Sequence, residues 1–221
     1  MGIVPHIALD LLLDSLRTLD ERTLLLFVAV AGETAGDVFL VEESSARYLS
    51  SDGAAEKLVE ALLQTYLFAG FPAAIEALKA AHRAAERCNR ELRTPLIEQY
   101  DVTLFERRGT ALFERIYGEM TPRVRTLLDA LSPQLHQWTI IEGYGKVLSR
   151  PTLLTLIERE MCAVVSLIVG GWNVQLRSHM QALVALGVER NVLSDVLDAA
   201  AVVATPEHLA QAQTLVDALW Q

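Results

Sequence analysis

Glu160 and His179 are the side chains of this 221-residue sequence whose surroundings best suit proton chemistry. Glu160 lies three residues after Ile157 and four before Val164, within the apolar stripe of an expected helix that opens at Pro151. His179 occupies a similar place in the apolar stripe of the helix that follows. A carboxyl group and an imidazole on consecutive helices can meet in the interior, and side chains of these types transfer protons in many enzymes.

Two interpretations of this pair are open. Both require a hydrogen bond between the two side chains, because an ionisable group that is buried alone is costly. In the first, His179 donates or accepts a proton in a reaction, and Glu160 orients the imidazole or shares its proton. In the second, the pair is a satisfied polar contact of the core that ties two helices together. The residue pattern alone allows both.

Three further side chains are candidates for binding a substrate carboxylate near this pair. Arg150 precedes Pro151, at an expected helix N-terminus where anions are favoured. Arg177 lies two residues before His179, and either arginine can hold a carboxylate through two hydrogen bonds. Both arginines are alternatively solvated surface residues. Tyr144 lies between two glycines, where it either reaches into a pocket or caps a turn.

The cysteines and the remaining histidines indicate no metal or redox site. Cys88 and Cys162 are far apart, so neither belongs to a CxxC pair or a cysteine zinc site. The remaining histidines share no spacing with a second ligand, and they are His6, His82, His136 and His208. We therefore expect no metal and no cofactor, and we interpret Cys162 as a small packed apolar residue.

The composition excludes two classes of partner. Hydrophobic residues make up 52% of the chain, and the net charge is −9 with no basic run. Nucleic acid is disfavoured, because its phosphates require a basic face. The longest uncharged apolar stretch, Met161 to Trp172, is shorter than the ~20 residues that span a bilayer, so no membrane is expected. The N-terminus lacks the basic segment of a signal peptide, and we expect a cytoplasmic protein.

Apolar residues recur at helical spacing nearly everywhere, which predicts an all-α fold class. Thr205-Pro206 is typical of a helix start, because a capping side chain precedes a proline in the first turn. Ser132-Pro133 and Thr121-Pro122 have the same form. Glycines and prolines mark the expected turns, among them Gly143 to Gly145.

The helical pattern is repeated with a constant offset. Gly53 and Gly187 lie 134 residues apart, and so do Pro72 and Pro206. In both places a helix follows the glycine, breaks, and gives way to a second helix at the proline. This register predicts an internal duplication, with a degenerate repeat in residues 1–90 and a better-preserved repeat in residues 91–221, packed as one unit.

Several phrases resemble the carboxymuconolactone decarboxylase/AhpD-like family. They are ERRGTALFERIYG (106–118), EGYGKVLSRPTLLTLIERE (142–160), GGWNVQLRSHMQALVALGV (170–188) and, in the first half, TYLFAGFPAAIEALKAA (65–81). The resemblance covers most of the chain and implies an AhpD-like helical bundle. It also implies that Glu160 and His179 fall on the Glu and His positions of the family.

One departure from the family bears on the chemistry. The AhpD branch carries a CxxC pair between that Glu and His, whereas this chain has Trp172 and Gln175 there, and neither side chain supplies a thiolate. Trp172 is instead a candidate for substrate binding. The resemblance favours the catalytic interpretation of His179 and Glu160, with Arg150, Arg177 and Tyr144 around the substrate.

Three functions follow as expectations. The first is a cofactor-free acid–base enzyme similar to 4-carboxymuconolactone decarboxylase, acting on a small carboxylated lactone or a keto/enol acid. The second is an AhpD-like peroxidase of the peroxiredoxin type, which the missing CxxC disfavours. The third is a non-catalytic helical protein that binds a ligand or self-associates. Members of the family form trimers or hexamers, so the resemblance also implies a homo-oligomer.

Overall fold

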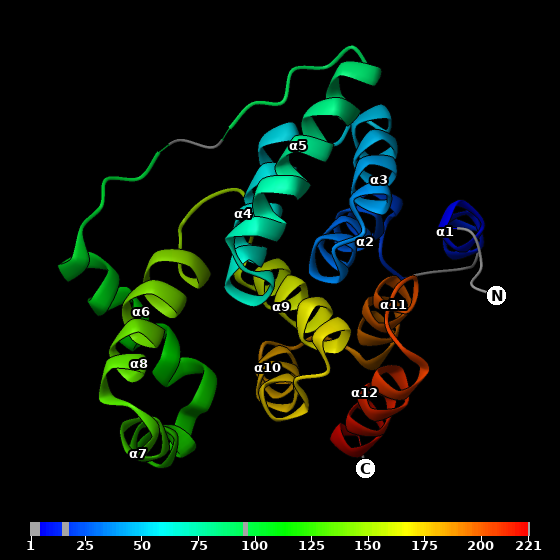
Figure 1. The fold of residues 1–221 in the computed structure, drawn as a ribbon. Coiled ribbons are helices and arrows are strands. Elements are labelled where there is room, and N and C mark those ends of the chain that lie inside the picture. Colours follow the sequence, from blue (N-terminus) through cyan, green and yellow to red (C-terminus); the bar gives the residue numbers. More distant parts are fainter. Residues whose placement is uncertain (1–4, 15–17, 95–96, 221) are drawn as a thin grey trace.

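The computed structural model describes residues 5–14, 18–94 and 97–220, and the regular elements within them are all helices, with no strand, as expected. The chain forms three groups of helices (Figure 1). The first group follows α1 (Pro5–Leu13) and contains α2 (Glu21–Ala35), α3 (Val38–Ser50), α4 (Ala55–Ala69) and α5 (Phe71–Arg87). The last contains α9 (Leu156–Gly170), α10 (Asn173–Ala185), α11 (Arg190–Ala201) and α12 (Pro206–Leu219).

The first and last groups run through the same series of helices. Both α2 and α9 are 15 residues long, and each ends at a glycine in the left-handed conformation, Gly36 (φ 71°) and Gly171 (φ 72°). A side chain at these positions is strained, so the shared glycine is a requirement of the turn. The matching series supports the duplication predicted from the sequence, which stays a prediction.

The two groups share one hydrophobic core around α2. Every residue of α2 from Leu24 to Glu33 is buried, as expected of a helix that is covered on all sides. The helices packed against it are α3, α4, α5, α9 and α11, so neighbours come from both groups. The core therefore spans both halves of the chain.

A third group of helices lies to one side of this core (Figure 1). It contains α6 (Val102–Tyr117), η1 (Gly118–Met120), α7 (Thr121–Leu131), α8 (Pro133–Trp138) and η2 (Thr139–Leu148). Its own small core joins α6 to η2, and its buried members are Leu112, Phe113, Ile140, Tyr144 and Leu148. The η2 segment is a π-helix of ten residues, a rare form that is usually limited to a single turn.

The turn expected at Gly143 to Gly145 is therefore wrong, because these residues lie inside η2. The glycines serve close packing instead. A Cβ atom on Gly145 would lie 2.0 Å from the carbonyl oxygen of Phe105, and one on Gly109 would lie 2.0 Å from that of Ile140. Glycine at these two positions lets the backbones of α6 and η2 approach each other.

Of the four expected helix starts, those at Ser132 and Thr205 are confirmed and the one at Pro151 is wrong. At Thr121-Pro122 a helix does begin, α7, but the Thr121 side chain makes no capping hydrogen bond within the described residues. The side chains of Ser132 and Thr205 accept hydrogen bonds from the first turns of α8 and α12, and a proline follows each. The helix expected to open at Pro151 instead begins at Leu156, where Thr155 and Glu158 form a reciprocal capping box. The capping pair satisfies the free backbone amides of the first turn, so the helix begins after Thr155. The residues between Ser149 and Thr155 form a linker.

Glu33, near the end of α2, has a buried carboxyl group with no hydrogen-bond partner in the described part of the chain. Burial raises the pKa of Glu33 to about 9, from 4.5. Between these values the folded chain keeps a proton that the unfolded chain has lost, so stability falls as pH rises. We expect the free energy of unfolding to drop by about 1 kcal/mol per pH unit in this window.

Urea unfolding at about pH 6 and about pH 8 measures this decrease. A Glu33→Gln variant should lose the pH dependence, whereas the matched variant of an exposed neighbour, Glu76→Gln, should keep it. Equal slopes for the wild type and Glu33→Gln would show that Glu33 does not titrate in this way.

Candidate functional site

His179 and Glu160 meet in the interior, as both interpretations of the sequence require. His179 Nδ1 lies 2.7 Å from Glu160 Oε2, and the side chains are 7% and 0% exposed. Glu160 is a buried residue of α9, and His179 is a buried residue of α10. The tight turn at Gly171 joins these two helices. The second carboxyl oxygen, Oε1, has no hydrogen-bond partner in the described residues. The pair thus links two helices of the core.

Tyr144 is buried beside this pair, neither on the surface nor in a turn. Its hydroxyl donates a hydrogen bond to the Tyr117 hydroxyl at 3.1 Å, and its ring packs edge-on against Phe113. Burial raises the pKa of both tyrosines, and the charge of nearby Glu160 adds to the effect. Both phenols therefore stay protonated at neutral pH, and Tyr144 serves the packing of η2 on α6.

Arg177 and Trp172 are exposed, whereas His179, Glu160 and Tyr144 are buried. Arg177 is exposed on α10, and Trp172 is 59% exposed immediately before that helix. Cys162 is 1% exposed, and burial raises the pKa of its thiol to about 12, so it carries no thiolate at neutral pH. In the described residues, His, Cys, Asp and Glu form no group of three or more suited to a metal ion.

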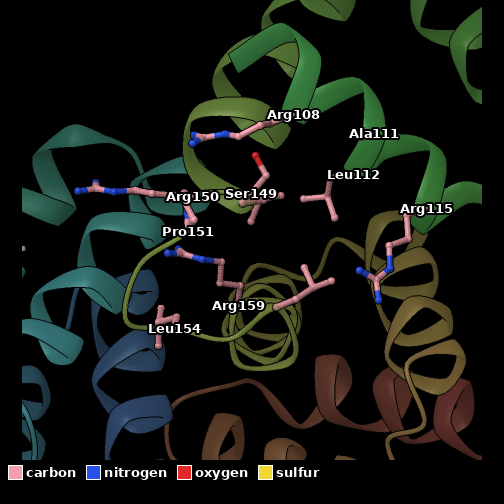
Figure 2. A pocket seen from close by; sticks show the side chains of 11 residues that line it. Arg108, Ala111, Leu112, Arg115, Ser149, Arg150, Pro151, Leu154 and Arg159 are labelled. Atoms are coloured by element: carbon pink, nitrogen blue, oxygen red, sulfur yellow. The ribbon is translucent and has the colours of Figure 1, made fainter. Parts of the chain in front are cut away.

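Arg150 belongs to a different feature, which we call the arginine pocket. This is a cavity of about 400 Å³ between α6, the end of η2, the linker after it and the start of α9 (Figure 2). Four arginines line it, and they are Arg108, Arg115, Arg150 and Arg159. Its other lining residues are Ala111, Leu112, Leu148, Ser149, Pro151, Leu154 and Leu156. The pocket thus combines guanidinium groups with apolar walls.

Arg159 anchors the buried side of the arginine pocket. Its guanidinium donates to Glu60 at 2.6 Å, to Gln64 at 3.0 Å and to Thr152 at 2.8 Å. Arg150 Nε lies 3.6 Å from the same Glu60 oxygen, so two arginines share one carboxylate. The Nε of Arg159 is buried and makes no hydrogen bond within the described residues. On this side of the pocket, two guanidinium groups thus share one carboxylate of the described residues.

The other two arginines differ in how their charge is balanced. Arg108 forms an ion pair with Glu98 and donates to the carbonyl oxygen of Gly145 at 2.8 Å. Arg115 is exposed on α6, and no carboxylate of the described residues lies within ion-pair distance. In Figure 2, Arg115 lies on the opposite side of the pocket from Arg150 and Arg159. Within the part of the chain that the structure describes, the four guanidinium groups thus have two carboxylates, Glu60 and Glu98, at ion-pair distance.

The sequence identified only one member of this pocket. Arg150 was a candidate because of an expected helix N-terminus, yet no helix begins there, and its place comes from the linker instead. Arg108 and Arg115 lie on α6, and their partners on other segments are not visible from spacing. The sequence gives a weak sign that Arg159 is buried, since it lies between two glutamates, Glu158 and Glu160, in the first turns of a helix whose remainder is mostly apolar.

No family model matches this chain. A protein of Schizosaccharomyces pombe named Peroxisomal protein 2 is 27% identical over 139 residues, which are 61% of this chain and 62% of that protein. A protein of Saccharomyces cerevisiae with the same name is 25% identical over 108 residues, 47% of this chain and 38% of that protein. The chain thus spans less than two thirds of the length of either relative.

These findings correct three expectations. The chain is not identified as a member of the carboxymuconolactone decarboxylase/AhpD-like family, since no family model matches and the relatives carry another name. The expected decarboxylase-like activity and its peroxidase alternative rested on that resemblance and are wrong as well. The expected cytoplasmic location is contradicted by relatives named as peroxisomal. Phrases rich in Ala, Leu, Gly and Pro suit many helical bundles, which explains the misleading resemblance.

No helix of the described residues combines the length and the apolar character needed to cross a lipid bilayer.

Proposed function

We propose that this chain binds a compact organic anion, a carboxylate or phosphate on a small apolar body, in the arginine pocket. The observation that supports it most directly is the excess of guanidinium groups over carboxylates in one cavity. An arginine presents a planar fork of donors that matches a carboxylate or phosphate in two hydrogen bonds. Partial enclosure strengthens these contacts, since less water screens them.

The apolar part of the ligand has its own contacts. Leu112, Leu148, Leu154 and Leu156 line the pocket between the charged groups. Burial of apolar surface against them contributes roughly 25 cal/mol per Å². A ligand with one or two anionic groups and a short carbon skeleton therefore fits better than a bare inorganic ion.

Arg115 offers the sharpest test, because it is exposed and its side chain makes no hydrogen bond or ion pair with the described residues. We expect Arg115→Ala to weaken the binding of succinate about tenfold, since a hydrogen bond to a charged group contributes about 1.5–3 kcal/mol. Isothermal titration calorimetry with succinate and with inorganic phosphate measures the effect.

Arg177→Ala is the matched control, because Arg177 is also exposed but lies outside the pocket. It should leave the affinity unchanged. An equal loss with both variants would mean that the net charge, and not the pocket, attracts the anion, and absence of succinate and phosphate binding by the wild type would refute the proposal.

A peroxisomal location for this chain is part of the proposal, and the names of the two distant relatives support it. The expected homo-oligomer also stays a prediction. Its support is the exposed apolar side chains of α7 and α8, where Leu131 is 69% and Trp138 is 57% exposed.

The expectation that the chain is an enzyme stays a prediction as well, with His179 and Glu160 as its candidate residues. Neither side chain lines the arginine pocket, and a link between α9 and α10 is the role that their burial supports best. An enzymatic role of this pair would require a substrate that reaches His179 itself, and a His179→Gln variant should then keep the fold while losing turnover of that substrate.

A further inference from the structure

A second hollow lies on the other side of Arg150 from the arginine pocket. It has a volume of about 280 Å³ and is formed by α4, α5 and η2, and we call it the α5 groove. Two large apolar side chains that line the α5 groove are exposed, Phe71 by 68% and Ile75 by 55%. The rings of Tyr66 and Phe71 stack with centroids 4.9 Å apart, and Leu78 continues the same apolar surface.

Two cations also line the α5 groove. They are Lys146 of η2 and Arg150 of the linker. Lys146 is paired with Glu142 at 3.0 Å and lies over the ring of Tyr66. Glu60 also lines the groove, but it is 2% exposed and held by Arg159 at 2.6 Å, so its charge is offset from behind. The groove therefore pairs an apolar surface with cationic side chains.

We infer that the α5 groove binds a single-chain alkyl carboxylate, with the carboxylate at Lys146 and Arg150 and the alkyl chain on Tyr66, Phe71, Ile75 and Leu78. Charge complementarity selects this occupant, because three cations at this end of the groove, Lys146, Arg150 and Arg159, share two carboxylates of the described residues, Glu142 and Glu60. An anionic head group balances the remaining positive charge, which a purely apolar partner cannot do. An alkyl chain also covers the exposed apolar side chains, which an inorganic anion or a short diacid leaves in water. The inference stands apart from the anion site proposed above, although the two share Arg150.

Chain length provides the first test. Each fully buried methylene group strengthens binding about fourfold, so affinity should rise steadily from hexanoate to octanoate to decanoate. Calorimetry below the micelle concentration of each fatty acid measures the series. Succinate, which has no alkyl tail, should weaken decanoate binding only through the shared Arg150 and should gain nothing from the apolar side chains of the α5 groove.

Variants on the two sides of Arg150 separate the two proposals. Ile75→Glu places a negative charge where the chain lies, and Lys146→Met removes one cation. We expect each to weaken decanoate binding about tenfold or more and to leave succinate binding unchanged. Arg115→Ala should instead weaken succinate binding and leave decanoate binding unchanged. Val174→Glu is the control, because Val174 is 75% exposed on α10, outside the groove.

Three results would overturn the inference. One is a wild-type protein that does not bind decanoate, and another is an equal loss of affinity in Val174→Glu and Ile75→Glu. The third is a wild-type oligomer that Ile75→Glu dissociates in sedimentation experiments while decanoate fails to bind, since a second copy then covers the groove. Circular dichroism of each variant confirms that the fold is intact before its affinity is interpreted.

Discussion

Replacement of Gly145 by alanine should lower the free energy of unfolding by about 3 kcal/mol or more, or prevent folding altogether. The added Cβ would lie 2.0 Å from the carbonyl oxygen and 2.5 Å from the carbonyl carbon of Phe105. Both are backbone atoms of α6, so no rotation of a side chain relieves the overlap. The only remedy is separation of α6 from η2, which opens the small core around Phe113 and Tyr144.

Gly143→Ala is the matched control, two residues earlier in the same π-helix. A Cβ at Gly143 meets nothing within 4 Å, so this variant should be as stable as the wild type or slightly more stable. Urea unfolding followed by circular dichroism compares the two. If Gly145→Ala and Gly143→Ala unfold at the same urea concentration, the close approach of α6 to η2 is wrong.

Replacement of Arg159 by methionine is the second large effect that we expect, a loss of about 3–5 kcal/mol of stability. The change removes the cation that contacts Glu60 at 2.6 Å. The Glu60 carboxylate is only 2% exposed, so water cannot replace this partner. Gln64 and Thr152 lose their hydrogen-bond donor at the same time. Arg150 still lies 3.6 Å from Glu60, which offsets only part of the loss.

A double-mutant cycle isolates this interaction. Glu60→Gln in the Arg159→Met background removes the uncompensated charge, so the double variant should recover more than half of the lost stability. Chemical unfolding of the wild type, the two single variants and the double variant provides the four free energies. Additive losses would show that the two residues do not form a coupled buried pair.

Local patterns in the sequence predicted the helices well, but they predicted the sites only in part. Thr205 and Ser132 act over three residues, so their caps could be recognised directly. The contact between His179 and Glu160 was predictable because two apolar stripes on consecutive helices fix it. The place of Tyr144 could not be predicted, because the glycines on either side of it indicated a turn, whereas the chain forms a π-helix there.

The arginine pocket escaped sequence reasoning for a different reason. Its members come from segments about 50 residues apart, and the partners of Arg159 on α4 are more than 90 residues away along the chain. No spacing rule connects such positions. The charge of each arginine is visible in the sequence, but whether a carboxylate cancels it depends on the packing of α4 and α6 beside the linker. Site residues held by distant elements therefore need the structure.

The burial of α2 has a consequence for how the chain acquires its fold. Residues 21–35 are made before α9 and α11, which cover part of them and follow about 135 residues or more later. Contacts between such distant segments form slowly, because a long loop must close first. During that interval the nascent first half exposes an apolar helix surface, the kind of intermediate that chaperones recognise.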